Sequence, residues 1–189
     1  MNDKQCLVIN LIGGPGSGKS TTMAGVFYYL KKHGVNCEMA TEFTKEKVWD
    51  EQYRILDEQI YIIGRQHHRI RRLVDKVDII IMDTTLLSSV IYDKTNNKTL
   101  KDFCLNIFNN FNNMVFFIDR TNIKYQTEGR VESLEKSQAI DEAYKNLMDE
   151  CHIPYTIVNN DNALDVIINK LEEEGYIEKF DDKNKLLKV

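Results

Sequence analysis

The sequence has few of the features that mark secreted, fibrous or membrane proteins. Only two prolines occur among 189 residues, Pro15 and Pro154, and neither lies in a stretch that resembles a linker. The four cysteines are widely separated and form no Cys-x-x-Cys pair, so we expect reduced interior thiols rather than a metal site. No apolar run approaches the ~20 residues that cross a bilayer, and the N-terminus has no basic segment leading into a cleavable apolar core. We therefore expect a cytoplasmic protein with no membrane partner.

The sequence also lacks a large excess of charge of either sign. Its net charge is −4 and its pI is about 5.6, so nucleic acid is disfavoured as a partner, although local basic patches leave it open. With 42% hydrophobic residues, the chain can form one domain with a real core. We expect that domain at residues 1–175 and a charged tail at 176–189. The tail either docks on the domain or pairs with another copy in a homo-oligomer.

Apolar segments of strand length alternate with segments of helical periodicity along the chain, which is the pattern of a βαβ protein. Two of the segments are nearly continuous apolar runs, typical of parallel strands that are covered on both faces. The pattern predicts an α/β fold with a five-stranded parallel sheet and helices on both faces. The predicted strands are Cys6–Ile12, Asn36–Ala40, Asp78–Met82, Met114–Ile118 and Tyr155–Val158.

Helical spacing of apolar residues is clearest in two stretches between these strands. The first is a long segment with Leu56, Ile60, Ile63, His67, Ile70 and Val74 on one face. The second, Leu100–Phe111, has an aromatic-rich face that includes Phe103 and Phe108, which we interpret as core rather than as a binding surface. Two further helices are predicted at Ser20–Lys32 and Ala163–Leu171.

Residues 13–20 read Gly-Gly-Pro-Gly-Ser-Gly-Lys-Ser and match the phosphate-binding pattern G-x-x-x-x-G-K-[ST]. The pattern follows a predicted strand and precedes a predicted helix, which is the context that gives it meaning. Its glycines allow torsions that turn successive N–H groups toward an anion. The alternative is a glycine-rich turn with a solvated lysine. The residues expected to bind ATP are Gly13, Gly14, Gly16, Ser17, Gly18, Lys19, Ser20 and Thr21.

Three of these residues have specific expected roles. Lys19 should reach the β and γ phosphates, the Ser20 hydroxyl should ligate Mg²⁺, and Thr21 is placed for the α phosphate. The sequence therefore predicts ATP and Mg²⁺ as cofactors.

Asp83 follows the third predicted strand at the carboxyl edge of the sheet, where open α/β folds bind ligands. It resembles a Walker B aspartate and is predicted to hold Mg²⁺ together with Ser20, because this ion prefers oxygen ligands. The alternative is a residue of a strand-end turn. Thr84 stands where motor ATPases usually carry a glutamate, and no Asn-Lys-x-Asp guanine motif is present. Both features weaken an ATPase or GTPase interpretation.

Glu42 follows the second predicted strand at the same edge and is our first candidate for a general base and acceptor contact. The alternative is that Glu42 belongs to the first turn of a helix reaching Trp49, where the helix dipole favours an acid. Gln66 could hydrogen-bond an acceptor. The neighbouring histidines are interpreted as structural, and the arginines from Arg65 to Arg72 as a solvated helix face that could also meet an anion.

The segment at about 120–135 is polar and basic, and we predict that it is a lid. Arg120 and Arg130 would neutralise a transferring phosphoryl group when the lid closes. Tyr125 could stack on a base of the acceptor. The alternatives are a solvated loop without a catalytic role and an ordinary surface tyrosine.

Taken together, the phosphate loop, the Thr41–Phe43 segment, the strand end at Asp83-Thr84 and the lid resemble the ribosylnicotinamide kinase-like branch of P-loop kinases, over roughly Val8 to Val158. The resemblance implies a three-layer P-loop NTPase fold, Mg-ATP, and phosphorylation of a hydroxyl on a nucleoside-like acceptor. It also implies that Asp83 serves metal and acceptor and that Tyr125, Glu128 and Arg130 act in the lid. The family's nicotinamide kinases prefer Trp and Asp where Tyr125 and Glu128 stand. The resemblance therefore supports ATP-dependent phosphorylation by this protein more than it supports their nicotinamide riboside substrate.

The sequence thus predicts a P-loop phosphotransferase that moves the γ-phosphoryl group of ATP to a hydroxyl or phosphate of a small nucleoside- or nucleotide-like acceptor. Catalysis is assigned to Lys19, Glu42, Asp83, Arg120 and Arg130, with Glu42 and Asp83 both open as the base. One rival is a regulatory ATP-binding module or weak ATPase, which needs no acceptor pocket. Another is a kinase acting on a nucleic-acid end or a modified base in DNA. In that case the arginines from Arg65 to Arg72 would contact the phosphates of the nucleic acid.

Overall fold

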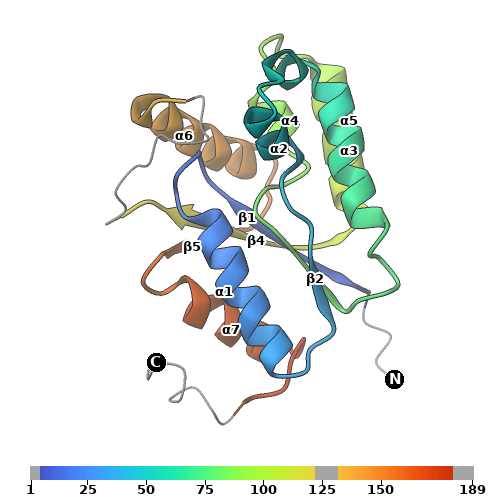
Figure 1. The fold of residues 1–189 in the computed structure, drawn as a ribbon, viewed down its shortest axis with the longest axis vertical. Helices are drawn as coiled ribbons and strands as arrows, with labels where there is room; N and C mark the ends of the chain where they lie inside the picture. The colour runs from blue at the N-terminus through green and yellow to red at the C-terminus, as the bar shows by residue number, and fades with distance from the viewer. Residues whose placement is uncertain (1–4, 122–131, 181–189) are drawn as a thin grey trace.

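The computed structural model describes residues 5–121 and 132–180, in which five parallel strands lie between two layers of helices (Figure 1). The strand order is β2-β3-β1-β4-β5, so the first strand of the chain lies in the middle of the sheet. The strands are β1 (Leu7–Ile12), β2 (Cys37–Met39), β3 (Ile79–Met82), β4 (Asn112–Asp119) and β5 (Thr156–Asn159).

The composition of β1 suits its central position, because all six of its residues are buried. Ile9 pairs with Ile81 of β3 on one side and with Met114 of β4 on the other. Alternate side chains of β1 enter different cores: Ile9 belongs to the core on one face of the sheet and Val8 to the core on the other. A strand with apolar side chains on both faces is stable only when helices cover both.

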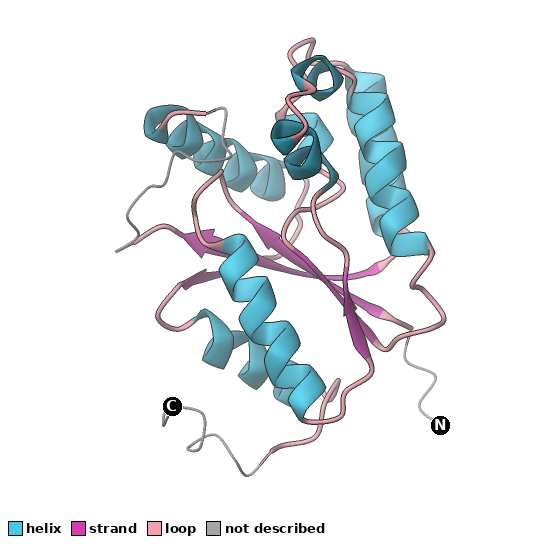
Figure 2. Cartoon of the chain, in the orientation of Figure 1, coloured by secondary structure: helices cyan, strands magenta, loops and turns pink. Residues whose placement is uncertain are grey.

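The helices supply those two covers (Figure 2). α1 (Lys19–Lys32) and α7 (Ala163–Glu173) pack on the face that holds Ile9. The face that holds Val8 is covered by α3 (Gln59–Arg71), α5 (Lys98–Asn109) and α6 (Leu134–Glu150). Three short helices complete the described fold: α2 (Phe43–Trp49), the 3₁₀ helix η1 (Tyr53–Asp57) and α4 (Ser88–Ile91).

The predicted α/β fold with a five-stranded parallel sheet is confirmed, and the ends of the predicted strands are shifted by only one or two residues. The long helix predicted from Leu56 to Val74 is wrong in extent, since η1 ends at Asp57 and α3 runs from Gln59 to Arg71. The buried face is also shifted, because Ile60 is 76% exposed while Ile62 is buried. Phe103, predicted in the core, is 50% exposed.

Helix α6 has no counterpart among the sequence predictions. Ser133 caps its start by accepting a hydrogen bond from the backbone N–H of Lys136. The buried face of α6 includes polar Ser137 and Asp141 beside Tyr144 and Met148. Since apolar periodicity is the main sequence signal of a helix, two polar residues on the buried face hide it.

The cysteines are free, as expected, although only two are fully buried. Burial raises the pKa of the Cys37 and Cys104 thiols to about 11. Within residues 5–121 and 132–180, none of the helices combines the length and apolar character needed to cross a membrane.

Helix α5 allows a direct test of this packing. Phe108 is 3% exposed and Phe103, on the same helix, is 50% exposed. We expect Phe108→Ala to lower the free energy of unfolding by about 3–5 kcal/mol, because it leaves a cavity in the core. Phe103→Ala should cost less than about 1 kcal/mol. Urea unfolding of both variants measures the difference, and equal losses would contradict the orientation of α5.

Candidate active site

The turn between β1 and α1 forms the phosphate loop. Gly13, Gly16 and Gly18 have φ values of 137°, 79° and 98°, a region that side chains with a Cβ avoid. Gly18 is also crowded, because a Cβ there would lie 2.2 Å from Oδ1 of Asn160. The glycines at these positions are therefore required by the backbone and, at Gly18, by a close neighbour from the connection between β5 and α7.

Lys19 is the first residue of α1 and bends back over the loop. Its Nζ donates hydrogen bonds to the carbonyl oxygens of Gly13 at 2.6 Å and Gly14 at 2.9 Å. Loss of hydration lowers the pKa of the Lys19 ammonium, while the nearby carboxylates of Glu42 and Asp83 act in the opposite direction. The ammonium is held at the loop by carbonyls, which a phosphate anion could replace with a stronger bond between opposite charges.

Asp83 joins the phosphate loop to the segment after β2. One of its carboxylate oxygens accepts a hydrogen bond from the Ser20 hydroxyl at 2.7 Å, and the other accepts from the backbone N–H of Glu42 at 2.9 Å. Asp83 is only 3% exposed. Since β3 lies beside β1 in the sheet, the end of β3 delivers this carboxylate to the start of α1.

Ser20 and Asp83 fit a magnesium ion. A hydroxyl and a carboxylate are hard oxygen donors, and Mg²⁺ is commonly held by one or two protein groups together with water and nucleotide phosphates. Among the residues the structure describes, no group of three or more His, Cys, Asp or Glu side chains is arranged to hold a metal. The site thus has the sparse protein ligand set that suits a nucleotide-bound Mg²⁺.

Glu42 immediately precedes α2, with extended backbone torsions of −64° and 126°. The alternative considered from the sequence is thus partly right, because a helix does follow, but Glu42 lies before its first turn. Its carboxylate accepts a hydrogen bond from the Thr44 hydroxyl at 2.5 Å. Loss of hydration raises the pKa of Glu42, and Lys19 opposes that rise. A carboxylate with a raised pKa is a better proton acceptor near neutral pH.

Gln66 fixes the segment that carries Glu42. Its Oε1 accepts from the backbone N–H of Phe43 at 3.0 Å, and its Nε2 donates to the carbonyl oxygen of Thr41 at 3.3 Å. Arg69, one turn along α3, donates to the same carbonyl at 3.0 Å. Gln66 lines the cleft, but both ends of its amide hold the backbone on either side of Glu42. Its expected contact with an acceptor stays a prediction.

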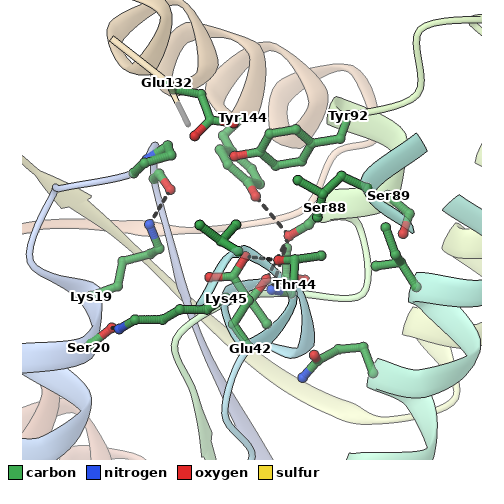
Figure 3. Close-up of a pocket in the computed structure, with 18 of the residues that line it drawn as sticks. Lys19, Ser20, Glu42, Thr44, Lys45, Ser88, Ser89, Tyr92, Glu132 and Tyr144 are labelled. Atoms are coloured by element: carbon green, nitrogen blue, oxygen red, sulfur yellow. Dashed lines mark hydrogen bonds between the residues drawn. The ribbon is translucent and has the colours of Figure 1, made fainter. Parts of the chain in front are cut away.

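A cleft of about 410 Å³ extends from the phosphate loop into the space between α2, α3 and α6. Figure 3 shows Lys19, Ser20 and Lys45 together at one side and Ser88, Tyr92 and Tyr144 at another. Side chains from the middle of the chain form the wall away from the loop. They are Glu42, Thr44, Val48, Trp49, Leu56, Gln59, Ile62, Ile63, Gln66, Thr84, Thr85, Leu86, Ser88, Ser89, Tyr92, Glu132 and Tyr144.

Several residues of the site were missed from the sequence. Lys45 of α2 donates a hydrogen bond from Nζ to Oγ of Ser20 at 3.1 Å. Tyr144 of α6 shares a hydrogen bond with Oγ of Ser88 at 2.8 Å, and burial raises the pKa of its phenol. A lysine three residues after Glu42 on a short helix was a usable signal for Lys45. Tyr144 could have been found only by predicting α6.

The predicted lid residues divide into two groups. Tyr125, Glu128 and Arg130 lie outside the described residues. Arg120 is described, and its guanidinium forms an ion pair with Asp141 of α6, with Nε 2.6 Å from Oδ2. It is not among the residues that line the cleft. Its expected contact with a transferring phosphoryl group therefore stays a prediction, and a different role is inferred below.

A phosphate loop after the central strand and an aspartate at the end of the adjacent strand define a P-loop NTPase fold. The chain belongs to the AAA domain family, whose model matches residues 8–164. This confirms the expected P-loop class. No curated protein matches the sequence.

Solved structures with the same fold include two kinds of kinase. Deoxyadenosine kinase from M. mycoides with bound dCTP is 21% identical, with a TM-score of 0.53 over 88% of this chain and 99% of that one. Thymidylate kinase from Ehrlichia chaffeensis is 15% identical, with a TM-score of 0.62 over 88% of this chain and 98% of that one. At these identities the likeness shows a shared fold.

The raised pKa of Glu42 predicts a stability effect. The folded protein holds a proton on Glu42 more tightly than the unfolded chain, so ionisation of Glu42 costs folding free energy. This loss of folding free energy is absent below pH 4.5, the ordinary pKa of the side chain. It grows as the pH rises toward and through the raised pKa of Glu42 in the folded protein. We expect Glu42→Gln to melt at a higher temperature than the wild type at about pH 8 and at the same temperature in acid.

Thermal unfolding across this pH range measures the effect, with Glu173→Gln on the exposed surface of α7 as the control. The control should match the wild type at each pH. A Glu42→Gln variant that is less stable than the wild type at about pH 8 would contradict the unfavourable burial of this carboxylate.

Proposed function

We propose that this protein is an ATP- and Mg²⁺-dependent kinase that transfers the γ-phosphoryl group to a hydroxyl of an uncharged, nucleoside-like acceptor. The observation that supports the proposal most is the extent of the cleft, whose first part lies at the phosphate loop and whose second part is lined by residues of α2, α3, α4 and α6. A nucleotide-binding regulatory module would need only the first part. The second part has the mixed apolar and polar lining of a small-molecule pocket.

The distribution of charge in the cleft favours an acceptor without a phosphate. Lys19 and Lys45 are the only basic side chains in the described lining. Both ammonium groups hydrogen-bond to the phosphate loop, Lys19 to its carbonyls and Lys45 to Ser20. The rest of the lining that the structure describes is apolar, neutral or acidic. Because a buried phosphate needs cationic partners, an acceptor phosphate against these described residues would be poorly stabilised.

The same wall suits a flat heterocycle and a sugar. Val48, Leu56 and Ile62 offer apolar contacts to a ring. Tyr92 offers a phenolic hydroxyl that can donate to or accept from an acceptor's own hydroxyls. The expected stacking of Tyr125, outside the described residues, would add to these contacts. A nucleoside uses both kinds of surface.

In this proposal, the loop amides and Lys19 bind the triphosphate, and Ser20 and Asp83 would hold Mg²⁺, which supplies charge neutralisation at the phosphates when bound. Glu42 accepts the proton of the attacking hydroxyl, since it lies at the cleft with a raised pKa. Asp83 is less suited to that task, because both of its oxygens already accept hydrogen bonds. Arg130 stays a candidate for neutralising the transferring group.

Turnover of Mg-ATP with a panel of nucleosides, their monophosphates and single-stranded DNA tests the proposal. We expect phosphorylation of at least one nucleoside and little of its monophosphate. Lys19→Ala should lower that rate by about 10²-fold or more, because a charge contact to the phosphates is lost. Hydrolysis that no acceptor stimulates would favour a weak ATPase, and preference for a monophosphate or for DNA would contradict an uncharged acceptor.

The base assignment predicts a pH profile. Because Glu42 must be ionised to accept a proton, the acid limb of kcat/KM should lie above pH 4.5, the ordinary pKa of this side chain. We expect Glu42→Gln to lower kcat by about 10²–10⁴-fold and to abolish that limb. Rates measured from acid to neutral pH provide the check. An unaltered rate in Glu42→Gln would transfer the role to Asp83.

A further inference from the structure

The phosphate loop is tied to helix α6 by a largely buried ion pair. Arg120, directly after β4, and Asp141, in the middle of α6, have side chains that are 14% and 10% exposed. The Asp141 oxygen that faces Arg120 lies 2.6 Å from Nε. The other oxygen accepts the backbone N–H of Gly14 at 2.6 Å. One carboxylate thus binds a loop amide and a guanidinium at the same time.

Ser137 completes the connection from one turn earlier on α6. Its hydroxyl accepts from Nη2 of Arg120 at 2.7 Å and donates to the carbonyl oxygen of Pro15 at 2.5 Å. Nη1 of Arg120 donates to the same carbonyl at 3.3 Å. Two consecutive loop residues, Gly14 and Pro15, are therefore bound through their backbone groups by three side chains.

The loop also packs closely against α6 at this point. A Cβ on Gly14 would lie 2.3 Å from the carbonyl oxygen of Ser137. Gly14 is not one of the described glycines with a positive φ. A glycine is therefore needed here because the helix lies so close, and not because the torsion is unusual. The contact leaves little freedom for the loop to move away from the helix.

A network of this kind destabilises the folded protein if one of its members is missing. Removing one partner of a buried ion pair leaves the other charge without compensation, whereas apolar residues of similar size would often be no less stable. A polar network against the loop is therefore weak evidence for stability, and it fits a role in fixing the shape of the loop. The network binds the amide of Gly14 and the carbonyl of Pro15, while Lys19 lines the cleft.

We propose that Arg120, Ser137 and Asp141 act as a clamp that holds the phosphate loop in the shape that receives a triphosphate. They are positioning residues, since they act on the nucleotide through Gly14 and Pro15. This proposal rests on the proposed nucleotide binding but assigns Arg120 a different task from neutralising the transferring phosphoryl group. It predicts that the clamp governs the affinity for ATP more than the rate of transfer.

Conservative variants of Asp141 and Ser137 test the clamp. We expect Asp141→Asn and Ser137→Ala to weaken Mg-ATP binding about tenfold or more in calorimetry. An amide has one acceptor oxygen where the carboxylate has two, so Asp141→Asn loses either the bond to Gly14 or the bond to Arg120, and Ser137→Ala loses the bond to the Pro15 carbonyl. Glu142→Gln is the matched control: Glu142 lies next to Asp141 and pairs with Lys145 at the surface, 2.8 Å away. The control should bind Mg-ATP as the wild type does.

A double-mutant cycle separates positioning from direct contact. If Arg120 acts through Asp141, the losses of Mg-ATP affinity in Arg120→Gln and Asp141→Asn should not add in the double variant, and kcat at saturating ATP should change little in any of the three. A large fall of kcat in Arg120→Gln alone, with normal ATP affinity, would overturn the proposal and restore Arg120 as a residue that contacts the phosphoryl group.

Amide hydrogen exchange provides a readout that needs no activity. In the free protein, the amide of Gly14 should exchange faster in Asp141→Asn than in the wild type and in Glu142→Gln. If the wild type binds no acceptor, the proposed function fails while this exchange and the ATP affinities still test the clamp. Unchanged exchange together with unchanged ATP affinity in Asp141→Asn would disprove it.

Discussion

The carboxylate of Asp83 is the interaction on which the arrangement of the site depends. It is buried, and its two oxygens bind the Ser20 hydroxyl and the backbone N–H of Glu42. These groups come from the segments after β1 and after β2, while Asp83 itself follows β3. A buried carboxylate needs such partners, because ionised oxygens without them are costly. The requirement brings the phosphate loop and the Glu42 segment to one edge of the sheet.

A second carboxylate acts on the opposite flank of the loop. Asp141 binds the Gly14 amide and Arg120, so the loop is held from the β3 side by Asp83 and from the α6 side by Asp141. The glycines that give the loop its torsions also leave it with few side chains of its own to pack. Contacts from neighbouring elements therefore replace the packing that a loop of larger residues would supply. Asn160, close to Gly18, is a third such neighbour.

The two parts of the cleft differ in chemistry for a structural reason. The phosphate end is built from backbone and from Lys19 and Lys45, which lie at the starts of helices, where anions are favoured. The other end includes residues of α3, Tyr144 of α6 and residues after β3. Their polar members, such as Gln66 and Tyr144, are engaged with backbone or hydroxyl partners.

The sequence by itself determined the fold class, the strands, the position of the phosphate loop and the placement of Glu42 and Asp83 after neighbouring strands. These features depend on local patterns: apolar runs of strand length, a glycine spacing and strand-end carboxylates. The sequence also indicated helix 56–74 and a buried Phe103, and both were wrong in detail. Apolar periodicity indicates that a helix has a buried face, but it does not determine the residue at which the helix starts. The starting residue decides which side chains face the core.

Only the tertiary structure decided what the polar residues do. Gln66 holds backbone beside Glu42, and Arg120 pairs with Asp141 instead of lining the cleft. Helix α6 escaped prediction because its buried face includes Ser137 and Asp141, whose partners lie more than a hundred residues away at Gly14 and Pro15. Hydrogen bonds between distant segments leave no periodic signal in the chain. Their geometry exists only once the sheet has brought those segments together.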